Sequence, residues 1–235
     1  MSDFKYSGEE LNVFEGALNW KSYWVKKIRP HIGKRILEVG AGIGATTVAL
    51  RNVPYESWVC IEPDTLLCKV ITQKRDAGLI ASNVEVKNCT SADLVGEKFD
   101  TILYIDVLEH IEKDCKEIQA AASLLNDDGK IIVLSPAHNY LYSAFDNKIG
   151  HYRRYNKKKL INLTPDGLGI IQIQYMDSIG FFASLANRLI LKQSDPSPAQ
   201  IKFWDRVMVP FSRIFDPLFF NMAGKSIIVI YQKKA

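Results

Sequence analysis

The chain has 235 residues with a net charge of +4, which suits one α/β domain with a sizeable core and favours neither nucleic acid nor an acidic partner. Its four cysteines form no C-x-x-C pair and no zinc spacing, so we expect reduced structural thiols and no metal site. The polar start resembles no signal peptide, and no eighteen-residue apolar run occurs, so we expect a cytoplasmic protein.

Strands and helices are predicted to alternate along the chain. Two N-terminal helices fall within residues 1–30, the first opened by a capping box at Ser7–Glu10 and the second spanning Trp20 to Ile28. The predicted strands lie at 35–39, 57–61, 83–87, 101–105 and 130–134, and the helices between them at 44–52, 64–77 and 112–125. A turn is expected at 126–129. This order predicts a doubly wound, mostly parallel sheet, which the segments 170–175 and 226–231 would complete as strands six and seven.

A glycine-rich turn, Leu37 to Ala45, joins the first strand to its helix. Gly40, Gly42 and Gly44 allow a sharp turn and a close approach of backbone to ligand, as in a nucleotide-binding cradle. The same spacing also fits the G-x-G-x-x-G/A dinucleotide fingerprint, so the turn alone leaves the cofactor open.

Two acids narrow the choice of cofactor. Glu38 lies two residues before the first glycine, where a fixed carboxylate would disfavour a pyrophosphate and favour the ammonium and sulfonium of S-adenosylmethionine. The alternative is a strand-end carboxylate satisfied by backbone amides. Glu62 follows the second strand and could reach a ribose of either cofactor, or could be a solvated loop acid.

Four segments in this order resemble the class I S-adenosylmethionine-dependent methyltransferases of the bacterial type 11/12 kind. They are Ile36–Gly44, Ile61–Asp64, Phe99–Ile111 and Gly129–Pro136, within a resemblance covering about residues 15 to 180 and a final strand. The resemblance implies a Rossmann-like seven-stranded fold whose last strand is antiparallel. The family usually has an acid after the third strand near the adenine amine, whereas here Thr90 or Asp93 would fill that role.

The resemblance also implies the cofactor-binding residues. Glu38 and Gly40 would hold the methionine end, Glu62 the ribose, and Thr90 or Asp93 the adenine. Trp20 and Tyr23 could close over the cofactor, although helix packing explains them equally well. His110 could act as a general base, but we interpret it mainly as a structural or positioning residue and expect it among the cofactor contacts. The remaining expected contacts are Ala41, Gly42, Pro63, Cys89, Ser91, Ile105, Asp106 and Val107.

A long polar loop follows the fifth strand and is typical of a functional segment. His138 and His151 are candidates for proton transfer, because histidine titrates near neutral pH. Arg153 and Arg154 are candidates for clamping a substrate carboxylate or phosphate. Alternatively, the arginines pair with acids such as Asp146. Asn156 is expected to cap the next helix.

The segment 181–221, between the last two strands, is rich in phenylalanine, lysine, arginine and proline. It is interpreted as a helical lid, with a dimer surface or a basic amphipathic membrane patch as alternatives. We therefore expect a single methyltransferase domain over 1–235, acting by direct displacement on a small-molecule or lipid- or sugar-linked acceptor, without nucleic acid. The alternatives are an NAD-dependent oxidoreductase and a non-catalytic S-adenosylmethionine-binding protein.

Overall fold

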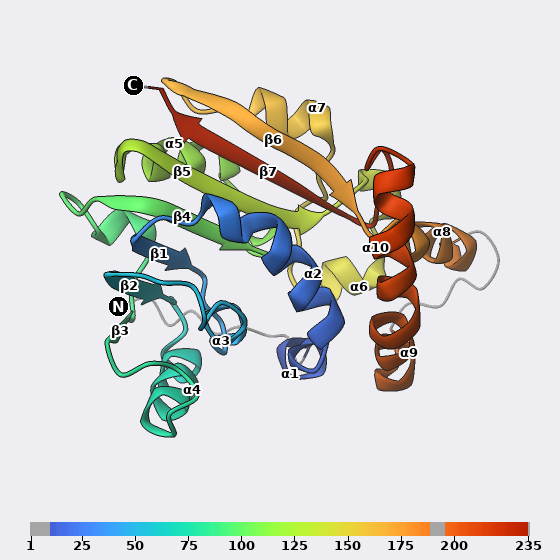
Figure 1. Ribbon diagram of the computed structural model, residues 1–235, viewed down its shortest axis with the longest axis horizontal. Coiled ribbons are helices and arrows are strands. Elements are labelled where there is room, and N and C mark those ends of the chain that lie inside the picture. Colours follow the sequence, from blue (N-terminus) through green and yellow to red (C-terminus); the bar gives the residue numbers. More distant parts are fainter. Residues whose placement is uncertain (1–9, 189–195, 235) are drawn as a thin grey trace.

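A seven-stranded sheet forms the centre of the molecule, in the strand order β3-β2-β1-β4-β5-β7-β6 (Figure 1). The computed structural model describes residues 10–188 and 196–234. The predicted N-terminal capping residues Ser7 to Glu9 and part of the predicted lid, 189–195, lie outside them. The fold class expected from the sequence is confirmed, with helices on both faces of a mostly parallel sheet.

The strands agree closely with the predicted runs. They are β1 (Arg35–Val39), β2 (Ser57–Ile61), β3 (Val84–Lys87), β4 (Phe99–Ile105), β5 (Leu125–Pro136), β6 (Leu168–Met176) and β7 (Ser226–Lys233). The α-helices are α1 (Glu10–Glu15), α2 (Leu18–Ile28), α3 (Ala45–Ala49), α4 (Thr65–Asp76), α5 (Asp114–Ser123), α6 (Ala144–Lys148), α7 (Lys157–Asn162), α8 (Ser178–Ala186), α9 (Pro198–Phe203) and α10 (Val209–Leu218). A π-helix, η6 (Trp204–Met208), joins α9 to α10, and Asn156 caps α7 as expected. None of the helices in the described ranges is long and apolar enough to cross a membrane.

The last strand runs antiparallel between β5 and β6, as the family resemblance implies. The largest difference from the predicted boundaries is at the start of β5. The expected turn at 126–129 lies inside β5, where the partner of β4 jumps from Leu125 to Lys130 and Asp128 adopts a φ of 60°. Asp, Asn and Gly in this stretch allow a bulge that leaves the strand unbroken.

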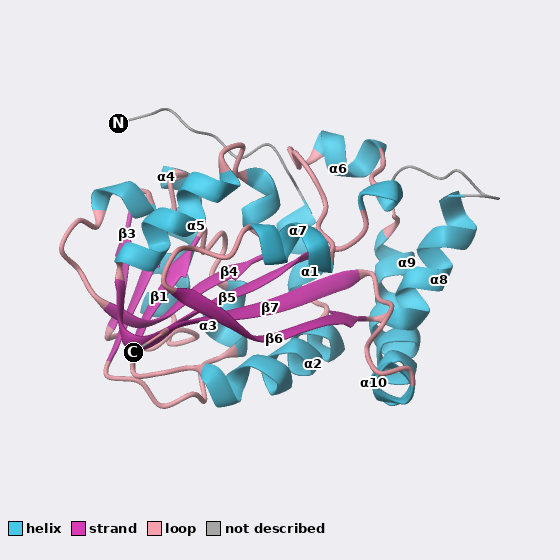
Figure 2. Ribbon diagram, turned by 90° about the horizontal axis from the view of Figure 1, so that it is seen from above, coloured by secondary structure: helices cyan, strands magenta, loops and turns pink. Residues whose placement is uncertain are grey.

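Helices lie on both faces of the sheet (Figure 2), and an apolar layer of side chains packs on each face. Strand side chains alternate between them: Leu37 faces the layer that includes Ile118 of α5, and Ile36 faces the layer that includes Trp24 of α2. The continuous apolar strands are thereby buried on both faces, as in other parallel sheets. The carboxyl ends of the parallel strands point toward α6 and the helices α8 to α10 (Figure 1).

Buried carboxylates connect α2 to the helices inserted between β6 and β7. Asp205 of η6 accepts hydrogen bonds from the backbone N–H groups of Asn19 and Trp20, at 3.2 and 2.8 Å, and so caps the start of α2. Asp216 of α10 accepts one from the Tyr23 hydroxyl at 2.8 Å and two from the backbone at the start of α8. The inserted helices are therefore fixed to the N-terminal part of the chain by charge-assisted hydrogen bonds.

Replacing Asp205 by alanine should lower the free energy of unfolding by about 1–2 kcal/mol, because it removes the acceptor for the first N–H groups of α2. Urea denaturation followed by circular dichroism measures this. Asp76→Ala, at an exposed position on α4, is the matched control and should change little. Equal stability of the two variants would show that Asp205 does not cap α2 in solution.

Candidate active site

The glycine turn brings β1 close to the loop after β4. Gly40, Gly42 and Gly44 have φ angles of 61°, 57° and 75°, in the region that favours glycine. A Cβ atom on Gly40 would lie 2.8 Å from Val107, and one on Gly44 would lie 2.9 Å from Ile80. The turn therefore needs glycine at these two positions for packing as well as for backbone conformation. Val107, a predicted cofactor contact, lies next to the turn.

Glu38 is buried beneath the turn. One carboxylate oxygen, Oε2, accepts hydrogen bonds from Thr47 Oγ1 at 2.7 Å and Trp58 Nε1 at 3.1 Å. The other oxygen, Oε1, has no hydrogen-bond partner among the described residues. Burial raises the pKa of Glu38 to about 7, and hydrogen bonds from Thr47, Trp58 and the Cys60 thiol oppose this only in part. A buried, half-satisfied carboxylate fits an additional donor, such as an ammonium group.

Glu62 reaches the same turn from the end of β2. Its carboxylate accepts hydrogen bonds from the backbone N–H of Gly42 at 2.8 Å and of Asp64 at 3.0 Å. Burial raises its pKa, although both backbone hydrogen bonds oppose the shift. Glu62 is therefore fixed at the edge of the glycine turn, and Pro63 follows it there.

Asp106 and Lys225 form the charged part of the site beyond the sheet. Asp106 follows β4 with a φ of 54°, and its side chain is exposed to solvent although much protein surrounds it. The surrounding protein raises its pKa by partial desolvation, while the charge of Lys225 opposes the shift. Lys225 precedes β7 and lies with its Nζ 5.1 Å from the Trp204 ring centroid. Desolvation lowers the Lys225 pKa, and Asp177 is the main opposing charge.

The predicted adenine segment forms a short helical turn, η2 (Ser91–Asp93). Asp93 accepts hydrogen bonds from the Thr90 backbone N–H at 2.9 Å and the Thr90 hydroxyl at 2.8 Å. Both candidates therefore belong to one capping box. Ser91 is buried and Cys89 packs against the core, so Thr90 and Asp93 present the more accessible polar groups.

Trp20 and Tyr23 lie between α2 and the inserted helices. The Trp20 ring contacts Trp204 with centroids 5.7 Å apart, and the Tyr23 hydroxyl donates to Asp216. Both side chains are buried. These contacts account for the two aromatic residues by helix packing, the alternative stated for them above.

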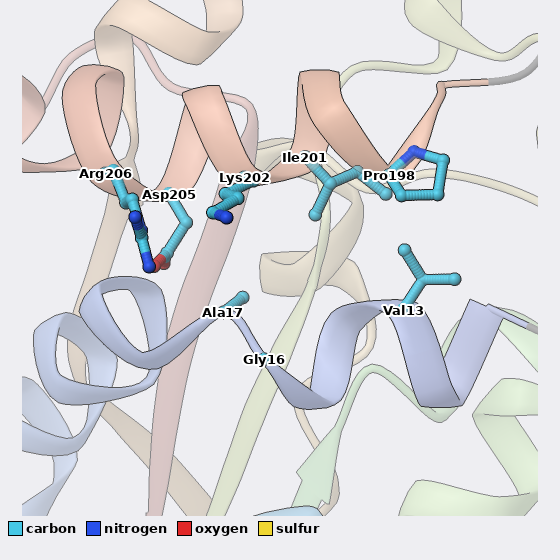
Figure 3. Close-up of a pocket in the computed structure, with 8 residues that line it drawn as sticks. All are labelled: Val13, Gly16, Ala17, Pro198, Ile201, Lys202, Asp205 and Arg206. Carbon is cyan, nitrogen blue, oxygen red and sulfur yellow. The ribbon is translucent and has the colours of Figure 1, made fainter.

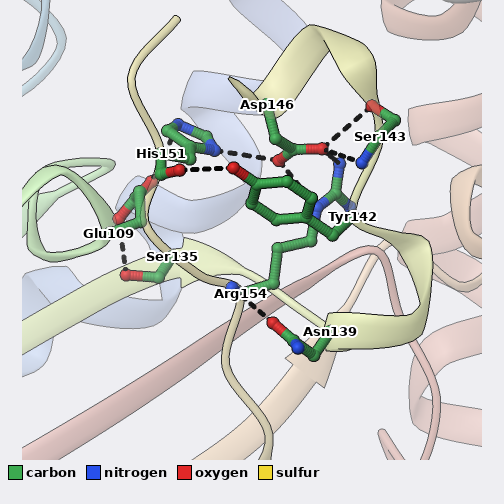
Figure 4. A network of polar contacts seen from close by, with 8 residues as sticks. All are labelled: Glu109, Ser135, Asn139, Tyr142, Ser143, Asp146, His151 and Arg154. Atoms are coloured by element: carbon green, nitrogen blue, oxygen red, sulfur yellow. Dashed lines mark hydrogen bonds and ion pairs between the residues drawn. The ribbon is translucent and has the colours of Figure 1, made fainter. Parts of the chain in front are cut away.

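Asp146 organises the loop between β5 and α7 (Figure 4). Its carboxylate accepts hydrogen bonds from Arg154 Nε and NH2, each at 2.8 Å, and from the Ser143 backbone and hydroxyl. The His151 ring nitrogen Nδ1 lies 2.9 Å from the same carboxylate. Burial alone would raise the Asp146 pKa, but the bonds from His151 and Arg154 hold it well below its usual range.

The expectation of an arginine clamp for substrate is corrected by these contacts. Arg154 is buried with its guanidinium forked onto Asp146, and Arg153 pairs with Asp114 at 2.7 Å and donates to the Glu112 carbonyl. A guanidinium already held by a protein carboxylate is not available for a bidentate grip on a second anion. The two arginines hold the loop instead.

The histidines occupy different environments. His138, with a φ of 65°, stacks on Tyr175 with centroids 4.7 Å apart, and its buried Nε2 has no hydrogen-bond partner within the described ranges. Burial lowers its pKa, so the ring is neutral near pH 7. His110 and His151 meet edge to face with centroids 4.5 Å apart. Burial, with the nearby His151, lowers the His110 pKa to about 4.

A separate hollow of about 430 Å³ lies between the α1–α2 junction and the helices α9 and η6 (Figure 3). Figure 3 shows Val13, Ile201 and Pro198 facing it from the two sides, with Lys202 and Arg206 beside it. None of the residues that line it is one of the predicted site residues. It lies beside the inserted helices, and its lining includes no residue of the glycine turn.

Three charged residues of this region were not singled out from the sequence as site residues. They are Glu109, Asp146 and Lys225, which lie far apart in the sequence. Glu109 is fully buried and accepts a hydrogen bond from the Ser135 hydroxyl at 2.9 Å. The signal was present for Glu109, an acid inside the apolar segment Val107–Ile111. Lys225 and Asp146 carried no comparable signal, because only the tertiary fold brings them to this end of the sheet.

Comparison with known proteins shows a consistent similarity. A family model described as a methyltransferase domain matches residues 23–167. A ubiquinone biosynthesis O-methyltransferase from Azorhizobium caulinodans is 26% identical over 110 residues. That stretch covers 46% of this chain and only 42% of the relative.

Two solved structures share the fold. Coclaurine N-methyltransferase bound to N-methylheliamine and SAH has 14% identity and a TM-score of 0.62, with 92% of this chain and 72% of that chain covered. The [4+2]-cyclase SpnF has 15% identity and a TM-score of 0.63, with coverage of 93% and 81%. At these identities the likeness concerns the fold, which hosts more than one kind of chemistry.

Replacing Asp146 by asparagine should lower the free energy of unfolding at pH 7 by about 3–5 kcal/mol, because it leaves Arg154 buried without its counter-ion. The native pKa of Asp146 is depressed. Its contribution is therefore complete above about pH 4, the usual aspartate pKa, and is lost as pH falls below that value.

Urea unfolding of wild type and variant at several pH values tests this, with Asp166→Asn, at an exposed position, as the control. The difference between wild type and Asp146→Asn should shrink as the solution is acidified. A difference that does not depend on pH would contradict the ion-pair explanation.

Proposed function

Because the chain belongs to the S-adenosylmethionine-dependent methyltransferases, as the match over residues 23–167 establishes, we propose that it transfers a methyl group to a small-molecule or lipid- or sugar-linked acceptor. The observation that carries the proposal is the buried Glu38 beneath the glycine turn, with one oxygen left without a hydrogen-bond partner among the described residues. A carboxylate at this position suits the cationic end of S-adenosylmethionine and opposes the pyrophosphate of NAD. The cofactor of the family is accordingly assigned to this turn.

Each part of the cofactor has a matching group in the site. Glu38 and the backbone of Gly40 to Gly42 would hold the methionine end, and Glu62 would accept from the ribose hydroxyls after giving up its bond to Gly42. Thr90 or Asp93 would hold the adenine amine, with Ile105 and Val107 beside the rings. Asp106, exposed where β4 ends, would border the acceptor side.

The bound cofactor supplies an electrophilic methyl group, so no covalent protein nucleophile is needed. The residues of the chain have three tasks: to align the acceptor, to exclude water and to accept a proton where the acceptor carries one. His138 is the stronger candidate base, because its ring is neutral and its Nε2 is left without a partner in the part of the chain that the structure describes. His151 is already engaged by Asp146, which fixes its orientation.

The alternative of a non-catalytic binding protein predicts cofactor binding without methyl transfer. The polar groups that line this end of the sheet, Asp106, Lys225 and His138, favour catalysis. Incubation of the purified protein with a metabolite extract and isotope-labelled S-adenosylmethionine should yield a labelled product by mass spectrometry. Binding without any labelled product would support the non-catalytic alternative.

Glu38→Gln should weaken S-adenosylmethionine binding by about 1–3 kcal/mol, the usual contribution of a hydrogen bond to a charged group. Because the Glu38 pKa is raised to about 7 in the free protein, cofactor binding near that pH should also release a proton from Glu38. Calorimetry in buffers of different ionisation enthalpy measures both effects.

Glu85→Gln, at an exposed position on β3, is the matched control and should retain wild-type binding. Asp106 is a second acid with a raised pKa, so it could also release a proton when the cofactor binds. Asp106→Asn separates its share of the proton release from that of Glu38. Tighter binding of NAD than of S-adenosylmethionine, or an unchanged affinity in Glu38→Gln, would contradict the assignment.

The inserted helices carry an exposed apolar face, which we propose contacts an anionic lipid surface. We call this the α10 face; it comprises Phe211, Ile214, Phe215, Leu218, Phe219, Phe220 and Met222, all exposed. Phe211, Phe215 and Phe219 stack in succession along it. Lys202 and Arg206 are exposed on the preceding turns, so the chemistry matches an amphipathic helix on anionic lipid. Such a surface would give access to a lipid-linked acceptor.

Combined replacement of Phe215 and Phe219 by serine should reduce partition onto vesicles of anionic phospholipid by at least about tenfold, because two large apolar side chains are lost. Val95→Ser, at an exposed apolar position in the β3–β4 connection away from the α10 face, should have no effect. Sedimentation velocity provides the counter-test. A concentration-dependent dimer that the double variant abolishes, without vesicle binding, would overturn the lipid proposal in favour of a second copy.

A further inference from the structure

We propose that Glu109, His110 and His151 bind one divalent transition-metal ion, although the sequence predicts no metal site. Each residue offers one ligand atom, and these atoms all lie within 4.8 Å of one another. The three come from two segments, the turn η3 (Leu108–His110) after β4 and the loop before α7. A separation of about 40 residues between His110 and His151 hides the set from any spacing motif.

One carboxylate oxygen of Glu109 is placed to bind a ligand such as a metal ion. The Glu109 side chain is fully buried, yet Oε1 has no hydrogen-bond partner in the described ranges. It lies 3.9 Å from His151 Nε2, beyond hydrogen-bond distance. Two ligands of one ion, each about 2.1 Å from it, stand roughly 3–4 Å apart. The observed separation therefore fits two atoms that share an ion between them.

The outer contacts of the three ligands are those that metal sites use. His151 Nδ1 lies 2.9 Å from the Asp146 carboxylate, which orients Nε2 toward Glu109 (Figure 4). Glu109 Oε2 accepts from the Ser135 hydroxyl at 2.9 Å. The His110 ring donates a hydrogen bond to the backbone carbonyl of Gly150. Metal-binding histidines commonly donate a hydrogen bond from their second ring nitrogen to a carboxylate or backbone oxygen. Ligating carboxylates commonly accept hydrogen bonds as well.

The donor set indicates the class of ion. Two imidazole nitrogens and one carboxylate oxygen suit zinc, cobalt, manganese or iron in the divalent state, whereas magnesium and calcium prefer oxygen ligands alone. Three protein ligands leave at least one coordination position open. The charge also fits, because Asp106 and Asp146 add negative potential around Glu109.

Metal binding can be measured without cofactor or acceptor, so its failure would not affect the proposed methyl transfer. Tag-free protein, stripped with a chelator and dialysed, is titrated with Zn²⁺ in a calorimeter and with Co²⁺ in a spectrophotometer. We expect one equivalent of each, with Co²⁺ visible bands and no thiolate charge-transfer band, because the set contains no cysteine. A tenfold excess of Mg²⁺ should not displace either ion.

His151→Gln and Glu109→Gln should each weaken Zn²⁺ binding by at least tenfold. His31→Gln, which removes an imidazole distant from the cluster, should bind as the wild type does. Circular dichroism shows whether Glu109→Gln folds. If it does not, the proposal is tested by Zn²⁺ binding to His151→Gln and by the nuclear magnetic resonance spectrum of the Co²⁺ form. That spectrum should show paramagnetic shifts for two of the four histidines. Absence of stoichiometric binding, or shifts of other histidines, would overturn the proposal.

Discussion

The site depends on one buried carboxylate, that of Asp146. It accepts five hydrogen bonds, from Ser143 N and Oγ, His151 Nδ1, and Arg154 Nε and NH2, so its charge is fully compensated away from water. Through these bonds a long, irregular connection between β5 and α7 acquires a single conformation. This conformation fixes the orientation of His151 and brings its ring near Glu109. It also holds the Arg154 guanidinium on Asp146, away from any substrate.

Buried carboxylates that accept several hydrogen bonds also occur where the inserted helices meet the rest of the molecule. Asp205 caps α2, Asp216 receives the start of α8, and Asp177 accepts from Ser212 and Trp204. Each acid satisfies groups of an element remote from it in the sequence. Association of these helices is therefore specified by directional bonds as well as by apolar packing, while the α10 face remains exposed.

Local patterns predicted the sheet well, because strand burial, turn glycines and helix caps act over short distances. Glu38 stood out in the sequence as an acid in an apolar strand. In the structure it is buried, and one of its oxygens has no hydrogen-bond partner in the part of the chain that is described. The loop residues were harder. The sequence left two roles open for Arg154, a substrate contact or an ion pair with Asp146. The structure shows the ion pair, with a partner eight residues earlier in an irregular loop. The Glu109, His110 and His151 cluster depends on contacts between the turn η3 and that loop, which no local pattern encodes.

The placement of β7 has a consequence for biosynthesis. The strand made last is inserted between β5 and β6, and it supplies the only neighbour of β6 among the described strands. While a ribosome is still making this region, β5 presents an open hydrogen-bonding edge and β6 has nothing to pair with. The sheet can be completed only after residues 226–233 emerge. Before that point, the nascent chain exposes apolar strands to intermolecular pairing, and chaperone binding would be most valuable then.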